Sequence, residues 1–296
     1  MITALKGLFI AFAAVFAVIF GKDYAKASKE GTLEEQSFAK AGFTGLITDF
    51  FDTLGIGSFA PTIALSKALK LNISDKHMPG TLNVAHTIPV VTEAFIFTTV
   101  IPVDPATLIS LIASAVVGSY IGAGIIAKMD ERKIQLVMGI TLAATAVLMF
   151  LAHPAIDLMP VGGDATALTG SKLIIGIIGN FILGALMTAG IGLYAPGMAM
   201  VFFLGMSAKV AFPIVMGSCA MLMPVASAKF IKEQVYAKKA SLAITMCGVV
   251  GVLIAAFIVK EMPMDLLKGL VIIVISYTSF TMLKSALKSK DAEESK

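Results

Sequence analysis

Charged residues are scarce in this sequence. Only 14% of its 296 residues are Asp, Glu, Lys or Arg, whereas an average soluble domain has about 25%. Cysteine is scarce too, because Cys219 and Cys247 are the only two and both lie inside apolar segments. We therefore expect two reduced core residues rather than a disulfide framework or a metal site. The lysines lie between apolar runs without interleaved aromatic side chains, so no nucleic-acid partner is expected.

Apolar residues dominate instead. They make up 57% of the chain, and no polar side chain interrupts residues 8–20. A membrane span needs about 20 apolar residues, so this pattern predicts an all-α polytopic membrane protein with roughly seven to nine crossings. Turn and charge signals delimit apolar segments at 4–21, 42–66, 78–101, 105–127, 134–152, 173–206, 210–228, 240–259 and 266–287.

The first apolar run partly resembles a signal peptide. Lys6 precedes it, and residues 25–27 have the small-residue pattern of a cleavage site. The stretch directly after Phe20 is charged, which favours a retained first span over a cleaved leader. We assign 1–41 to this N-terminal transmembrane helix and a polar linker, with 21–40 forming a surface connection or an interfacial helix.

An internal repeat is the most informative feature of the chain. The segment 55–61, Gly-Ile-Gly-Ser-Phe-Ala-Pro, recurs 135 residues later as Gly-Ile-Gly-Leu-Tyr-Ala-Pro at 190–196. Matched glycines and prolines are informative because each sets backbone geometry. The same register aligns Thr53 with Thr188, Leu69 with Leu204, Pro89 with Pro224 and Phe95 with Phe230, and an offset of 133 aligns Gly118 with Gly251. We predict the following division: repeat 1 at 42–152, an extracytoplasmic loop at 153–171, repeat 2 at 172–287 and a charged tail at 288–296.

The distribution of basic residues predicts how the repeats are oriented. If both Gly-Pro segments cross the membrane, 13 of the 23 Lys and Arg lie inside and 10 outside. If each is a re-entrant hairpin, 18 of the 23 lie inside, which the positive-inside rule prefers. Each repeat then has one broken hairpin and three transmembrane helices, and the two repeats are inverted, as in many secondary transporters. This model predicts a plasma-membrane protein with a cytoplasmic C-terminus, although the 18 residues from Lys172 to Gly190 also allow a full span.

Each Gly-Pro segment predicts a helix, a break and a new helix that starts near Ser58 or Leu193. Non-helical backbone at membrane depth is tolerated only in a protein interior or beside a water-filled cavity. Proline suits the first turn of the new helix, and Ser58 is a candidate N-cap. Two such helix starts facing each other offer free N–H groups to an anion, with Gly57 and Gly192 allowing a positive φ or its close approach. The alternative is that the glycines serve only close helix packing. The candidate substrate-binding residues are Thr53, Gly55, Gly57, Ser58, Phe59, Thr188, Gly190, Gly192 and Tyr194.

The duplicated glycine break followed by proline, in a lysine-punctuated chain of this length, resembles the TauE/SafE family of sulfite and organosulfonate permeases. The resemblance covers nearly the whole chain after the first span. It implies transport of sulfite, an organosulfonate or a related small anion, often outward. Members often carry a longer glycine run than those at 55–58 and 190–193, so the resemblance defines the fold more closely than the substrate.

Four ionisable residues inside apolar segments are candidates for proton coupling: Asp49, Asp52, His86 and Glu93. A charge at the bilayer centre costs roughly 2.5–3.5 kcal/mol on insertion scales, so such residues point to function. An acid near the site can bind H⁺ at one face and release it at the other. The alternative is structural, with Asp49 or Asp52 capping backbone groups or pairing with a lysine.

Two competing functions are weighed against anion transport. An intramembrane hydrolase needs a paired acid, a Ser/His dyad or a metal set, and the sequence has no H-E-x-x-H motif and no evident histidine base for Ser58. A P-loop is also absent, so we expect a transporter rather than an enzyme, without a cofactor. The alternative within transporters is a cation or carboxylate carrier with Asp49, Asp52 and Glu93 as ligands. The expected partners are the small anion, the lipid bilayer and H⁺, and a homo-oligomer is left open.

Overall fold

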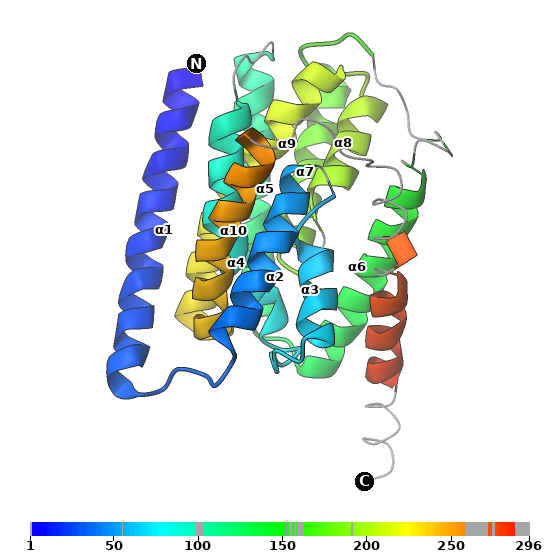
Figure 1. Ribbon diagram of the computed structural model, residues 1–296. Helices are drawn as coiled ribbons and strands as arrows, with labels where there is room; N and C mark the ends of the chain where they lie inside the picture. The colour runs from blue at the N-terminus through cyan, green and yellow to red at the C-terminus, as the bar shows by residue number, and fades with distance from the viewer. Residues whose placement is uncertain are drawn as a thin grey trace.

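The computed structural model describes residues 2–54, 56–98, 103–151, 153, 156, 158, 163–190, 192–257, 272–273 and 276–287. Figure 1 shows a bundle of the following helices: α1 (Ile2–Glu30), α2 (Phe38–Thr53), α3 (Phe59–Ala68), α4 (Met78–Phe97), α5 (Pro105–Ile126), α6 (Glu131–Leu151), α7 (Gly170–Met187), α8 (Tyr194–Phe203), α9 (Ala208–Glu233) and α10 (Lys238–Phe257). Residues 276–287 are also helical. These ranges contain no strand, only one isolated bridge between Ala165 and Met206. The predicted all-α class is confirmed. Gly55 and the tail at 288–296 lie outside the described residues.

Several helices are long and apolar enough to cross a membrane. Within the described ranges there are six: Thr3–Glu30, Pro105–Ile126, Glu131–Leu151, Gly170–Met187, Val210–Glu233 and Lys238–Phe257. The first span is longer than predicted, because α1 continues to Glu30 and only 31–37 separate it from α2. The helix α7 is among the six candidates whereas α2, with 16 residues, is not, so the second hairpin retains the length of a full span.

The helix ends form two groups at opposite ends of the bundle. At one end, the Lys40 ammonium donates to the Leu69 carbonyl at 3.1 Å, which joins the start of α2 to the end of α3. The turn before α10 lies at the same end, because the Ala237 N–H donates to Thr81 Oγ1 at 2.9 Å. We call this the lysine-rich end; it is the lower end in Figure 1, and α1 begins at the opposite end.

The two broken hairpins open toward different ends. The hairpin α2–α3 begins and ends at the lysine-rich end. The hairpin α7–α8 begins and ends at the opposite end, where a Cβ on Gly205, after α8, would lie 3.4 Å from the Lys172 ammonium. There the Ala165 N–H also donates to the Gly205 carbonyl at 3.2 Å. This arrangement supports the inverted repeat, which stays a prediction.

The first helix of each broken hairpin packs against a helix of the other half of the chain. The helix α2 packs along α10, and α7 packs along α5. A Cβ added to Gly251 would overlap the carbonyl oxygen of Leu46, and one added to Gly118 would overlap that of Phe181. The glycines are repeat equivalents at an offset of 133, and the carbonyl residues are equivalents at an offset of 135. Glycine at these positions serves close approach of two helix backbones.

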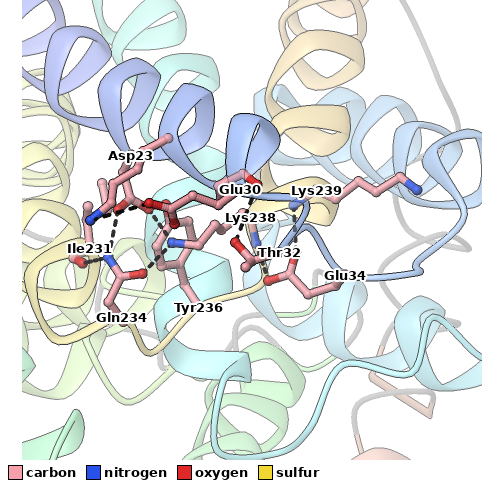
Figure 2. Close-up of polar contacts among 11 residues, drawn as sticks. Asp23, Glu30, Thr32, Glu34, Ile231, Gln234, Tyr236, Lys238 and Lys239 are labelled. Carbon is pink, nitrogen blue, oxygen red and sulfur yellow. Dashed lines mark hydrogen bonds and ion pairs between the residues drawn. The ribbon is translucent and has the colours of Figure 1, made fainter.

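The helix α1 lies on the outer side of the bundle (Figure 1) and packs against α9 and α4. Figure 2 shows how polar contacts fix its end at the lysine-rich end. The Asp23 carboxylate accepts from the Tyr236 hydroxyl at 2.5 Å and pairs with the Lys238 ammonium. Burial, with Asp23 beside it, raises the pKa of Tyr236, which keeps the phenol protonated as a donor. The Glu34 carboxylate caps the start of α10 by accepting from the N–H groups of Lys238 and Lys239, at 2.9 and 3.1 Å.

Candidate functional site

Both predicted helix breaks occur in the structure. The helix α2 ends at Thr53 and α3 begins at Phe59, while α7 ends at Met187 and α8 begins at Tyr194. The new helices therefore start directly after Ser58 and Leu193, as the sequence predicts.

One glycine in each break has a left-handed backbone conformation. Gly57 has a φ of +91° and Gly190 a φ of +102°, both in the left-handed region that favours glycine. A Cβ on either Gly57 or Gly192 would meet no atom of the described residues within 4 Å, so both glycines border open space.

The start of α3 departs from the predicted cap. Pro61, like Pro196 in α8, is the third residue of its helix, where a missing N–H removes no helix bond. Ser58 occupies the predicted N-cap position of α3, but its side chain makes no capping bond to the helix. The reason is its αR backbone, with φ −90° and ψ −34°, in place of the extended conformation typical of an N-cap. Its hydroxyl instead donates to Asp52 Oδ2 at 2.6 Å.

A cavity of about 40 Å³ lies between the two breaks. Its lining comes from the breaks and from α4 and α9: Asp52, Gly57, Ser58, Phe59, Val90, Glu93, Met187, Gly192, Leu193, Tyr194, Met216 and Cys219. Four pairs in this lining are repeat equivalents at an offset of 135: Asp52 with Met187, Gly57 with Gly192, Ser58 with Leu193, and Phe59 with Tyr194. Both halves of the chain therefore contribute the same positions to one cavity.

The cavity lies near the middle of the bundle's depth. Asp52 is 14 residues beyond the start of α2 at Phe38, about 21 Å along the helix from the lysine-rich end. Cys219 is 11 residues beyond the start of α9 at Ala208, about 17 Å from the opposite end. The two distances are similar, so the cavity lies about midway between the two ends of the bundle.

The cavity is lined by two carboxylic acids, Asp52 and Glu93. Glu93 is 5% exposed and makes no hydrogen bond or ion pair with any other described residue. None of the described lining residues is basic. Positive potential comes instead from the starts of α3 and α8, where free N–H groups and the helix dipole favour an anion.

Asp49 and His86 form a fully buried pair next to the first break. His86 Nδ1 lies 2.7 Å from Asp49 Oδ1, and its Nε2 lies 3.0 Å from Thr62 Oγ1. The Thr62 hydroxyl donates to Thr48 Oγ1 at 3.0 Å, so His86 Nε2–H donates to Thr62 and a second proton lies between Nδ1 and Asp49. Asp49 Oδ2 has no hydrogen-bond partner among the described residues. Among the described residues, neither Asp49 nor Asp52 pairs with a lysine. The other structural role considered for them, the capping of backbone groups, stays a prediction.

The remaining predicted residues are placed as follows. Phe59 lines the cavity, and its ring centre lies 5.8 Å from that of His86. The hydroxyls of Thr53 and Thr188 donate within their own helices, to the carbonyls of Asp49 and Ala185 at 2.9 and 2.6 Å, and neither residue lines the cavity.

Five lining residues are not predicted from the sequence: Val90, Met187, Leu193, Met216 and Cys219. The repeat register contains the signal for Met187 and Leu193, since they are the equivalents of Asp52 and Ser58. Met216 and Cys219 on α9 carry no such signal, because the equivalent positions of the first repeat do not line the cavity.

Comparison with known proteins identifies the family. No curated protein and no solved structure matches the chain significantly. The family profile described as Sulfite exporter TauE/SafE matches residues 1–149. This region includes the first break, Asp52 and Glu93. It also includes the first span, which the resemblance based on the glycine motifs does not cover. Because the match covers just over half of the 296 residues, the chain belongs to the sulfite exporter TauE/SafE family.

Proposed function

We propose that the protein is a secondary transporter that moves a small sulfur-containing anion, such as sulfite or an organosulfonate, outward across the plasma membrane. Membership of a sulfite exporter family supports the substrate class and the membrane location. The observation that carries the proposal is the mid-depth cavity to which both breaks contribute the same positions. In transporters built from inverted repeats, alternating access moves one repeat against the other around such a site.

The anion binds between the starts of α3 and α8. A bare anion in hydrocarbon is prohibitively unstable unless it is hydrogen-bonded. A helix terminus stabilises an anion by up to about 2 kcal/mol in a partly buried site, and here two termini border one cavity. The hydroxyls of Ser58 and Tyr194 add donors from either side.

The two acids of the cavity make anion binding depend on protons. Ionised Asp52 and Glu93 would repel an anion in a cavity this small, and no basic residue among the described lining offsets them. Ionised Asp52 also occupies the positive end of α3, through its bond to Ser58. Protonation of one of these two carboxylates therefore accompanies anion binding, and linkage requires that a bound anion raise proton affinity in return.

The pair of Asp49 and His86 supplies a second proton-holding group. It lies one turn from Asp52 on the same helix and is withdrawn from the cavity lining. The pair has no net charge whether the shared proton is bound to Asp49 or to His86. An isolated buried charge is thereby avoided. Movement of α2 relative to α4 would separate Asp49 from His86 and release or recapture that proton.

The membrane potential accounts for the outward direction. A doubly charged anion that moves with one proton carries one net negative charge. An inside-negative potential drives each such charge outward by about 2.3 kcal/mol per 100 mV. Export then proceeds whenever this contribution and the anion's own gradient exceed the opposing proton gradient.

Purified protein in liposomes tests the proposal. Uptake of radiolabelled sulfite, sulfate, acetate and Na⁺ is compared under imposed pH gradients and imposed potentials. We expect sulfite uptake that increases when the external solution is acidified and when the lumen is made positive, with little movement of acetate or Na⁺.

The same assay separates a second candidate function, a cation carrier. The two carboxylates in a cavity without a described basic residue favour this alternative. Na⁺ uptake that is independent of any anion, with no sulfite uptake at any pH, would overturn anion transport in favour of a cation carrier.

A further inference from the structure

An apolar groove runs along the outer helix α1, on the side that faces α5 and α9. Its first part, about 420 Å³ in volume, is lined by Ala11, Phe12, Val15, Phe16, Ile19, Tyr120, Pro224, Val225, Ala228, Lys229 and Lys232. Its second part, about 400 Å³, is lined by Ala4, Leu5, Leu8, Phe12, Leu108, Ile109, Ile112, Ala113, Val116, Val117 and Met221. Phe12 lines both parts, so they form one groove beside α1.

The dimensions of the groove fit a lipid chain. Along α1 it extends from Ala4 to Ile19, which corresponds to about 23 Å of helix. One leaflet of a bilayer has a hydrocarbon depth of about 15 Å, half of the full core. The groove is longer than this depth, so it can hold an acyl chain along the whole leaflet. All side chains of the second part are apolar, whereas the polar ones of the first part are Tyr120, Lys229 and Lys232. The groove is therefore an apolar channel with basic residues at one end only.

The basic end of the groove is the lysine-rich end of the bundle. Lys229 and Lys232 lie in the last two turns of α9, and Lys22 follows Val15 and Ile19 on the same face of α1. The Lys229 ammonium is 2.8 Å from Glu233 Oε1, whereas Lys232 makes no ion pair with a described residue. The neighbouring acid on α1, Asp23, is already engaged by Tyr236 and Lys238 (Figure 2), so positive charge is left in excess.

We propose that this groove binds an anionic phospholipid from the leaflet at the lysine-rich end. One acyl chain lies along α1 against α5 and α9, and the phosphate lies between Lys229 and Lys232. Each lysine near a membrane surface attracts an anionic lipid, and basic pockets between spans at this end of a bundle recognise such head groups. Tyr120, whose ring centre is 6.0 Å from the Lys229 ammonium, has the amphipathic character of a residue at the level of the head groups. The bound lipid fills the groove. It thereby connects α1 to α5 and α9 where the side chains of these helices leave a gap.

Thermal unfolding of the delipidated full-length protein tests the proposal. Phosphatidylglycerol and phosphatidylcholine with identical acyl chains are titrated in parallel, with inorganic phosphate as a third arm. We expect phosphatidylglycerol to raise Tm more than phosphatidylcholine does, and phosphate alone to have no effect. The combined change Lys229→Gln and Lys232→Gln should remove this difference and weaken phosphatidylglycerol binding about tenfold. The matched control is Lys133→Gln, an exposed lysine on α6 at the same end of the bundle.

Two further variants keep the test decisive. If the double variant does not fold, Lys232→Gln alone is used, since Lys232 makes no ion pair with a described residue. Ala11→Phe fills the groove and should weaken binding of both lipids without changing the preference between them. Equal stabilisation by the two lipids in the unaltered protein would overturn the proposal, as would a preference that survives loss of the lysines. A matching Tm increase with phosphate alone would assign the site to a free anion and would also overturn it.

Discussion

The Ser58 hydroxyl donates to Asp52 Oδ2 at 2.6 Å across the break between α2 and α3. This bond joins the end of one half-helix to the start of the next and holds the carboxylate at the positive end of α3. The second break has Met187 and Leu193 at the equivalent positions, so no such bond forms there. The two breaks therefore share their geometry but differ in chemistry, and we expect proton coupling to depend on the first break.

Replacing Asp52 with Asn should uncouple transport from the pH gradient. The amide oxygen still accepts from Ser58, so the loss in stability should be no more than about 1 kcal/mol, as for one weakened hydrogen bond. The side chain can no longer carry a proton, so sulfite uptake should lose its response to external acidification while anion binding persists. Uptake in liposomes and binding in detergent measure the two effects. An unchanged response to the pH gradient would assign Asp52 a purely structural role.

Replacing Gly192 with Ala should weaken anion binding without destabilising the protein. An added Cβ at Gly192 meets no atom of the described residues within 4 Å, so the methyl group projects into the cavity of about 40 Å³. Crowding of this kind costs roughly 1–3 kcal/mol, so we expect at least about a fivefold loss of affinity. Gly57→Ala is the contrasting variant, because a φ of +91° costs Ala about 1–2 kcal/mol of stability. Normal binding by a folded Gly192→Ala variant would show that the site lies elsewhere.

Much of the fold is predictable from the sequence because glycine and proline act locally. The starts of α3 and α8 follow from the Gly-Pro spacing, since proline is favoured in the first turn of a helix, where its missing N–H removes no helix bond. The end of α1 is predicted less well. Residues 21–30 are charged, but Asp23 bonds to Tyr236 in the α9–α10 turn, and this distant contact stabilises the part of the helix beyond its apolar run.

The candidate site is predictable only where the repeat provides a register. Alignment of the halves identifies Gly57, Gly192 and Tyr194, all of which line the cavity. It does not identify Cys219, because that position lines the cavity in only one repeat. It also places Thr188 at the site, whereas its hydroxyl is satisfied by a carbonyl of its own helix. Side-chain hydrogen bonding within a helix is a local alternative that spacing alone cannot resolve.

Adding a methyl group at Gly118 or Gly251 should destabilise the protein to a similar extent. Each Cβ would overlap a carbonyl oxygen of the facing helix, so the backbones must separate, at a cost of about 1–3 kcal/mol. The control is Gly21→Ala on α1, where the Cβ meets no atom and the higher helix propensity of Ala should be neutral or stabilising. Thermal unfolding in detergent measures all three variants. A large loss for only one of the two packed glycines would contradict their equivalence.

Asp49 and His86 should show strong energetic coupling. Replacing Asp49 with Leu leaves a buried imidazole without its partner, and breaking such a pair costs roughly 3–5 kcal/mol. Asp49→Asn keeps an acceptor at the same place and should cost less. Combining Asp49→Leu with His86→Leu should recover part of the loss, which denaturant unfolding of the four proteins measures as a double-mutant cycle. Additive losses would mean that the pair contributes no interaction energy.

Cysteine labelling should place the lysine-rich end in the cytoplasm. The re-entrant arrangement places 18 of the 23 Lys and Arg on that side, and basic residues in short loops are retained inside. In a background with Cys219→Ala and Cys247→Ala, we expect Lys29→Cys and Lys133→Cys to react with an impermeant thiol reagent only after cell lysis. Asp164→Cys, at the opposite end, should react in intact cells, because residue 164 is exposed between Gly163 and Ala165, which bond to the turn after α8. Reaction of positions 29 and 133 from different sides of the membrane would contradict the inverted arrangement. Reaction of positions 133 and 164 from the same side would show that α6, the described helix between them, does not cross the membrane.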